Sequence, residues 1–268
     1  MILVPTLAMA ARSDVGLHRR HNEDALYCDP PRGLAILADG MGGYNAGEVA
    51  SRMAVSQLAE QLGNFKLTDA VPMTTRPAII KDALSLAVSA ANAAIYVAAG
   101  RTPQYAGMGT TLVVAWFYNN RLSVAHVGDS RLYRWRGGAL EQLTRDHSFL
   151  QEQVDKGYLS AEQARHSPQR NLVTRALGVD PTVIPEIHDY ALEPTDLFLL
   201  CSDGLSDMLE DPEISTCLQT QAESLQHSVD QLIDRANDAG GRDNISVILV
   251  KVAAELTLSA AAQQDGSQ

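Results

Sequence analysis

Five short acidic motifs, spread along this 268-residue chain, are the residues best suited to chemistry. They are Asn22-Glu23-Asp24, Asp39-Gly40-Met41-Gly42-Gly43, Gly128-Asp129-Ser130, Ser202-Asp203-Gly204 and Arg242-Asp243-Asn244. Most of these carboxylates follow an apolar run or stand beside glycine, so we expect them to point from strand ends into a cleft. Two carboxylates about 4 Å apart, at an effective dielectric of about 20, repel by about 4 kcal/mol. Several of them at one point require a cation, and oxygen ligands suit Mg²⁺, Mn²⁺ or Ca²⁺. The motifs therefore predict a metal hydrolase.

The elements that must position these motifs are predicted to be hairpins of antiparallel strands, with helices in separate blocks. Apolar or β-branched runs predict strands over 25–29, 34–38, 110–118, 121–127, 131–136, 140–143, 183–190, 197–201 and 245–252. Apolar residues at helical spacing predict helices over 47–62, 77–99, 211–219 and 227–239, with weaker ones over 147–156 and 160–166. Asn119-Asn120 and Gly137-Gly138 predict tight turns. This order indicates an α+β layered domain, not a parallel βαβ sheet.

Two segments depart from this pattern. Residues 144–180 are polar and charged, and such an insert over a β core is typical of a mobile flap near a site. Residues 254–268 are rich in Ala, Gln and Ser and are predicted to be a disordered tail. We therefore expect a single domain over residues 1–253.

Composition narrows the class of protein. The net charge of −11 argues against nucleic-acid binding, which requires a basic face. The three cysteines show no CxxC spacing, so a disulfide framework or a zinc site is not expected and a reducing cytoplasm is. The apolar stretch Ala83–Ala99 contains Ser85, Ser89 and Asn92, which indicates a core helix and no membrane span.

At these motifs the chain resembles the metal-dependent protein phosphatases of type 2C, and in particular the compact bacterial members. The resemblance runs from about Ala8 to Val252 and keeps the family's order and spacing. Besides the acidic motifs it includes Ser13-Asp14-Val15-Gly16, Gly109-Thr110-Thr111 and Thr144-Arg145-Asp146-His147-Ser148. It implies a four-layer αββα sandwich, in which two central antiparallel β-sheets are flanked by helix pairs and the metal cleft lies at one edge of the β core.

The resemblance also implies roles for individual residues. Asp39 is expected to bridge two Mn²⁺ or Mg²⁺ ions, with the Gly40 carbonyl and Glu23 completing the first. Asp203 and Asp243 are expected to hold the second ion, and Asp129, together with Asp203, a weak third ion. Asp24 and Asn244 are expected to orient these ligands without touching an ion.

The implied reaction is hydrolysis of phosphoserine and phosphothreonine on proteins. Two ions sharing a water lower its pKa from about 15.7 toward about 7, so that hydroxide attacks phosphorus and no phosphoenzyme forms. Arg19 occupies the family's phosphate-binding position, where a guanidinium grips two phosphate oxygens. Some members carry a histidine soon after the bridging aspartate as a general acid. This chain has Met41 there, and a thioether cannot donate a proton.

Two other classes of function stay open on the sequence. Gly128-Asp129-Ser130 matches a motif of some serine esterases, but those enzymes place it near the N-terminus and need a later Asp-x-x-His, which this sequence lacks. A non-catalytic phosphoprotein-binding relative would have lost metal-ligating carboxylates, and none is missing. The resemblance implies phosphorylated proteins as partners, either a serine/threonine kinase and its substrates or the phosphoproteins of a secretion system. We expect a monomer.

Overall fold

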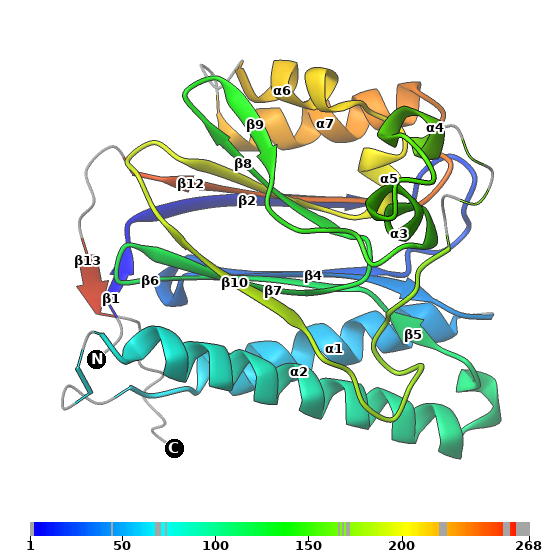
Figure 1. Cartoon of the computed structure of the whole chain (residues 1–268), viewed down its shortest axis with the longest axis horizontal. Coiled ribbons are helices and arrows are strands. Elements are labelled where there is room, and N and C mark those ends of the chain that lie inside the picture. The colour runs from blue at the N-terminus through cyan, green and yellow to red at the C-terminus, as the bar shows by residue number, and fades with distance from the viewer. Residues whose placement is uncertain are drawn as a thin grey trace.

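The computed structural model describes residues 3–43, 45–67, 71–72, 74–165, 167, 169, 172–219, 224–253 and 258–260. Two antiparallel sheets lie face to face at the centre, and helices cover both outer faces (Figure 1). The expected four-layer α+β sandwich is therefore confirmed.

The first sheet has strand order β10-β7-β6-β4-β3, with β5 paired to β4. Its strands are β3 (Asp24–Asp29), β4 (Leu34–Met41), β5 (Gly109–Thr110), β6 (Leu112–Tyr118), β7 (Arg121–Val127) and β10 (Glu186–Ala191). Its outer face is covered by α1 (Ala46–Gly63) and α2 (Arg76–Arg101), below the sheet in Figure 1. The short 3₁₀ turns Pro30–Arg32 and Pro103–Tyr105 follow β3 and α2.

The second sheet has strand order β2-β12-β11-β8-β9. Its strands are β2 (Leu7–Asp14), β8 (Arg131–Arg136), β9 (Ala139–Gln142), β11 (Leu197–Cys201) and β12 (Ile245–Val252). Helices α6 (Asp211–Gln219) and α7 (Leu225–Asp238) cover its outer face, and the short α5 (Asp203–Ser206) follows directly after β11 (Figure 1).

Four layers require three apolar interfaces, and strand β4 shows how one strand serves two of them. Leu34, Ile36 and Ala38 pack toward the helices, whereas Ala35 and Leu37 pack against the second sheet. Successive side chains of a strand point to opposite faces, so a strand buried on both faces is apolar throughout. This is why the central strands are unbroken apolar runs in the sequence.

Both predicted tight turns are present. Asn119 and Asn120 have φ of 46° and 58°, and Gly137 and Gly138 have φ of 58° and 86°. Two successive residues with positive φ form the turn whose twist matches that of paired strands. These turns fix the register of the β6–β7 and β8–β9 hairpins.

The flap, residues 144–180, contains α3 (Phe149–Asp155) and α4 (Ala161–Arg165). It is tied to the sandwich at its start, where the Arg131 guanidinium donates to both carboxylate oxygens of Asp146 at 2.7–3.0 Å. At its far end, Leu177 pairs with Thr110. Strand β10 begins at Glu186 and not at 183 as predicted, since Pro185 has no N–H to donate to a ladder.

Helix α2 is long and apolar enough to cross a membrane, judged by length and composition alone. In this fold its Ile80, Leu84, Val88 and Ile95 are buried in the core under the first sheet. The apolar composition is thus used to cover a sheet.

The predicted disordered tail needs one correction. Leu258–Ala260 forms a strand, β13, that pairs antiparallel with β1 (Leu3–Pro5). Val4 of β1 is 1% exposed and packs in the core next to the first sheet, which fixes β1 in place. The edge of β1 can then pair with residues 258–260. The other tail residues, 254–257 and 261–268, lie outside the described residues.

Candidate active site

The predicted carboxylates meet at one end of the sandwich, where strands of both sheets end. Asp24 and Asp39 are direct partners across β3 and β4 of the first sheet. Asp129 follows β7 of the same sheet, while Asp203 follows β11 and Asp243 precedes β12 in the second sheet. The charges of Asp24, Asp129, Asp203 and Asp243 all act on Asp39. Motifs far apart in sequence therefore face one another in the space between the sheets.

The electrostatics of this cluster are unfavourable for carboxylates alone. Burial raises the pKa of Asp39 well above its usual range, and the neighbouring Asp24 and Asp203 raise it further. Burial, followed by repulsion from Asp129, does the same to the pKa of Asp203. Burial also raises the pKa of Asp129 to about 7 and that of Asp24 to about 6. Each carboxylate makes its neighbour harder to ionise.

Three carboxylate oxygens in the cluster are buried without a hydrogen-bond donor: Glu23 Oε1, Asp24 Oδ1 and Asp203 Oδ1. Buried polar atoms are otherwise nearly always satisfied in proteins. A divalent cation would satisfy the oxygens of Glu23 and Asp203 and would offset the repulsion among the carboxylates, and oxygen-only donors suit Mg²⁺ or Mn²⁺. The residues present therefore fit a hard cation.

Glu23 reaches the cluster because Gly40 and Gly47, which lie next to it, pack closely against each other. A Cβ on Gly40 would lie 2.1 Å from the Gly47 carbonyl oxygen and 2.6 Å from that of Glu23. The Gly40 N–H donates to the Glu23 carbonyl at 3.1 Å. The start of α1 can therefore approach the end of β4 only where both residues lack a side chain.

Gly47→Ala should weaken cation binding although it improves helix propensity. Its Cβ would lie 2.7 Å from the Gly40 carbonyl carbon and 2.8 Å from Glu23 Oε1, so both must move. We expect the Mn²⁺ concentration for half-maximal activity to rise about 10- to 100-fold, as for other groups that orient ligands. Gly100→Ala in α2 is the matched control, because its Cβ meets nothing within 4 Å. Equal effects of the two changes would contradict this account.

Asn244 holds the loop that carries Glu23 and Arg19. Its side-chain nitrogen donates to the carbonyls of Val15 at 2.9 Å and His21 at 3.0 Å. Its side-chain oxygen accepts from the Glu23 N–H at 2.8 Å. With three contacts to one loop, Asn244 fixes where that loop presents its side chains.

Arg19 lies at the exposed side of the cluster, where its Nη2 donates to Asp243 Oδ2 at 2.6 Å. The charges of Glu23 and Asp203 also act on it. About half of the Arg19 side chain is exposed. A guanidinium in this place can exchange a carboxylate for an incoming anion.

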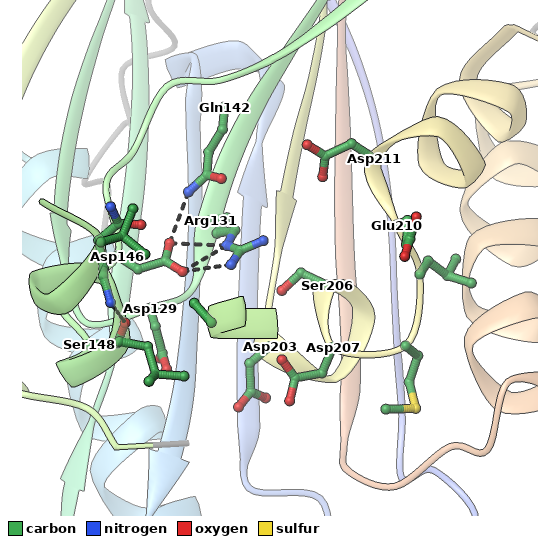
Figure 2. A pocket seen from close by; sticks show the side chains of 16 residues that line it. Asp129, Arg131, Gln142, Asp146, Ser148, Asp203, Ser206, Asp207, Glu210 and Asp211 are labelled. Atoms are coloured by element: carbon green, nitrogen blue, oxygen red, sulfur yellow. Dashed lines mark hydrogen bonds and ion pairs between the residues drawn. The ribbon is translucent and has the colours of Figure 1, made fainter. Parts of the chain in front are cut away.

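A pocket of about 370 Å³ opens from the cluster toward the flap. Figure 2 shows Asp129 next to Asp146 and Ser148 of the flap, with Asp203 and Asp207 beside each other across from it. The other labelled lining residues are Arg131, Gln142, Asp146, Ser148, Ser206, Glu210 and Asp211. The flap therefore forms one wall of an acidic pocket at the site, as its sequence suggested.

The sequence assigned no role to three residues that shape this site. Asp207 follows Asp203 by four residues across the turn of α5, and its charge acts on Asp203 and Asp129. The Thr111 hydroxyl accepts from the Asp39 N–H at 3.0 Å and bonds to the Ser130 hydroxyl at 2.7 Å. The Ser202 hydroxyl donates to Asp24 at 2.9 Å. The four-residue spacing could have revealed Asp207, but nothing in the sequence reveals the hydroxyl contacts.

Comparison with known proteins agrees with this fold and site. The profile of the family Protein phosphatase 2C matches residues 18–249. The serine/threonine protein phosphatase PstP of Mycobacterium tuberculosis is 42% identical over 249 residues, which are 92% of this chain and 45% of that protein. The serine/threonine phosphatase stp of Listeria welshimeri is 39% identical over 243 residues, which are 90% of this chain and 94% of that protein.

Among solved structures, the catalytic domain of PstP in complex with two manganese ions is 38% identical and superimposes with a TM-score of 0.81. The match covers 94% of this chain and all of that one (100%). The chain belongs to the protein phosphatase 2C family. It spans less than half the length of the whole PstP protein, but nearly all of the Listeria one.

Proposed function

We propose that the chain hydrolyses phosphoserine and phosphothreonine on proteins, with Mn²⁺ or Mg²⁺ as the cofactor. The observation that carries the proposal is the set of buried and half-buried carboxylates that repel one another, some of whose oxygens have no partner, with Arg19 at their exposed side. Such a set is costly without cations. The two manganese ions of the PstP catalytic domain support the same cofactor here.

In this proposal Asp39, the Gly40 carbonyl and Glu23 would hold one ion, and Asp39 would be shared with a second ion that Asp203 and Asp243 would hold. Asp129 with Asp203 would hold a weak third. Asp24 and Asn244 orient these ligands, which agrees with the Asn244 contacts to the loop of Glu23. When bound, such ions lower the pKa of water enough to supply a nucleophile at neutral pH, and they neutralise charge on the phosphoryl oxygens.

The chain's own residues then bind and orient the substrate. Arg19 is the phosphate-binding group, because its half-exposed guanidinium can offer two N–H donors to two phosphate oxygens. Hydroxide attacks phosphorus directly, so no side chain of the protein becomes phosphorylated. Met41 leaves no histidine to protonate the leaving group, and we infer that water serves this step.

A serine esterase is disfavoured by the surroundings of Ser130. Ser130 is 1% exposed, and its hydroxyl bonds to the hydroxyl of Thr111. A nucleophilic serine instead needs a base within hydrogen-bond reach and access to its substrate. A non-catalytic phosphoprotein-binding role is disfavoured because every carboxylate expected to bind a metal is retained.

The direct test is hydrolysis of an aryl phosphate and of a phosphothreonine peptide by the purified protein. We expect phosphate release with Mn²⁺ or Mg²⁺, complete loss in excess chelator, and recovery when metal is restored. A serine-directed acylating agent should have no effect. Turnover that survives chelation, or that is lost on acylation, would overturn the proposal.

For its setting, we propose a cytoplasmic monomer that opposes a serine/threonine kinase. The three cysteines are free thiols, as in a reducing compartment. The acidic pocket beside the flap gives a surface on which phosphoproteins can be distinguished. A phosphoproteome of cells lacking the protein would identify the kinase and its substrates.

A further inference from the structure

His147, at the start of the flap, packs on His126 of β7. The two rings are stacked, with centroids 4.7 Å apart and planes 19° apart. His126 is fully buried and His147 is 6% exposed. Burial lowers the pKa of both imidazoles, because it disfavours their charged form. Two buried histidines beside the carboxylate cluster therefore need a structural or functional explanation.

A metal site is one explanation, because ligand atoms of His126, His147 and Glu186 lie within 4.8 Å of one another. The ring geometry argues against it. A metal ion lies in the plane of each imidazole that binds it, and two nearly parallel stacked planes do not meet near the ligand atoms. The function of the pair must therefore lie in its hydrogen bonds.

Those hydrogen bonds hold the residue that precedes Asp129. The Gly128 N–H donates to His147 Nδ1 at 3.1 Å, and the His147 N–H donates to the Gly128 carbonyl at 2.9 Å. Both main-chain polar groups of Gly128 are thus bound by one residue of the flap. Asp129 follows directly and is 7% exposed.

The backbone of Gly128 is also restricted by its own conformation and by close contact with Thr111. Its φ is +104°, and a Cβ there would lie 2.7 Å from Thr111. Thr111 in turn accepts from the main chain of Asp39. The backbone before Asp129 therefore packs closely on Thr111, which also binds the backbone of Asp39, and His147 binds the same Gly128 through two hydrogen bonds.

The clamp requires one tautomer of His147. Nδ1 accepts from Gly128, so the ring proton is on Nε2, which lies 3.3 Å from Glu186 Oε2. The Arg175 guanidinium lies farther from Nε2, at 3.5 Å. Glu186 thus favours the tautomer whose Nδ1 lone pair is free to accept.

The same residue closes the flap on itself. The His147 carbonyl accepts from the Thr174 N–H at 2.8 Å, and the adjacent Ser148 pairs with Val173. The two arms of the flap therefore meet at the residue that binds Gly128.

We propose that His147 is a positioning residue, which orients Asp129 for its cation by clamping Gly128 and which joins the flap to that loop. The proposal rests on the proposed function, because it assigns the cation at Asp129. It predicts that cation affinity depends on a hydrogen-bond acceptor at the Nδ1 position and not on the imidazole as such.

Three substitutions at His147 distinguish the need for an acceptor at the Nδ1 position from the need for an imidazole. In His147→Asn the amide oxygen takes the place of Nδ1, in His147→Gln the amide takes the place of Nε2, and His147→Ala has neither. Glu186→Gln is the control, because the glutamine amide oxygen can still accept from Nε2–H and so leaves the Gly128 contact in place. We would measure Mn²⁺ binding by calorimetry, the Mn²⁺ dependence of the rate, and hydrogen exchange of the Gly128 amide.

Asn at 147 and Gln at 186 should keep the half-saturating Mn²⁺ concentration within about threefold of wild type, whereas Gln or Ala at 147 should raise it by about 10-fold or more. The Gly128 amide should stay protected in the first two variants and exchange faster in the others. Equal losses in His147→Asn and His147→Gln, or lower thermal stability with unchanged Mn²⁺ affinity, would overturn the proposal.

A variant that fails to fold does not prevent the test, because the Asn and Gln pair decides it. If the wild-type protein showed no Mn²⁺-dependent hydrolysis, the proposed function would fail. Exchange at Gly128 and calorimetric Mn²⁺ binding would still report on the clamp.

Discussion

Asp39→Asn should lower kcat by about 10³-fold or more, because the bridging carboxylate places both ions and their effect on the transition state is worth several kcal/mol. The same change should stabilise the metal-free protein. Asp39 is half-buried and feels the charges of Asp24, Asp203, Asp129 and Asp243, and a neutral amide of the same shape removes the central charge of that cluster. Steady-state kinetics at saturating Mn²⁺ and thermal unfolding in chelator would measure the two effects.

Asp82→Asn is the matched control for this change, since Asp82 is exposed on α2, away from the cluster. It should alter neither kcat nor the melting temperature. Full activity in Asp39→Asn would contradict the bridging role. Inactivity accompanied by lower stability of the metal-free protein would show that Asp39 is mainly structural.

Removal of metal should destabilise the protein, and more so as pH rises. In the metal-free state the folded pKa is about 7 for Asp129 and about 6 for Asp24, against an ordinary value of 3.8. The folded protein then binds protons more tightly than the unfolded chain. This contribution is fully present below the unfolded pKa and is lost as pH rises through the folded values, so the melting temperature in chelator should fall between pH 5 and about pH 8.

Divalent cations should reverse this loss. At about 100 times its dissociation constant a ligand adds about 2.7 kcal/mol, which raises the melting temperature of a domain of this size by about 5–10 °C. The rise with Mn²⁺ should be larger at pH 8 than at pH 5, because protons compete with the cation at low pH. Differential scanning fluorimetry at both pH values gives the comparison.

Asp129→Asn tests whether the pH dependence of stability comes from the carboxylate cluster or from the net charge of the whole protein. It should flatten the dependence of the metal-free melting temperature on pH between about 5 and 7, below the folded pKa of Asp129, and Asp82→Asn should not. If neither substitution changed the slope, or if Mn²⁺ left the melting temperature unchanged, the carboxylates would not form a preorganised cation site.

Much of the fold could be predicted because its signals are local. The predicted α6 and β12 coincide with the observed elements, and the asparagine and glycine pairs form the expected hairpin turns. The predictions were wrong where contacts in the folded protein determine whether a strand forms or where it begins. Pro185 delays the start of β10, and β13 exists because β1 is anchored by the buried Val4.

The sequence by itself determined which groups could do the chemistry, because the identity of a carboxylate and the glycine beside it are local properties. It also determined that the carboxylates stand at strand ends. Only the tertiary structure decided how they meet. Asp39 comes from one sheet, and Asp203 and Asp243 come from the other. The pKa values of Asp39 and Asp203 rise because packing removes water and brings like charges together. Three further contacts likewise join residues from separate elements: Gly40 with Gly47, His147 with Gly128, and Thr111 with Asp39. Such distances depend on how the elements pack, so they cannot be read from the order of residues in the chain.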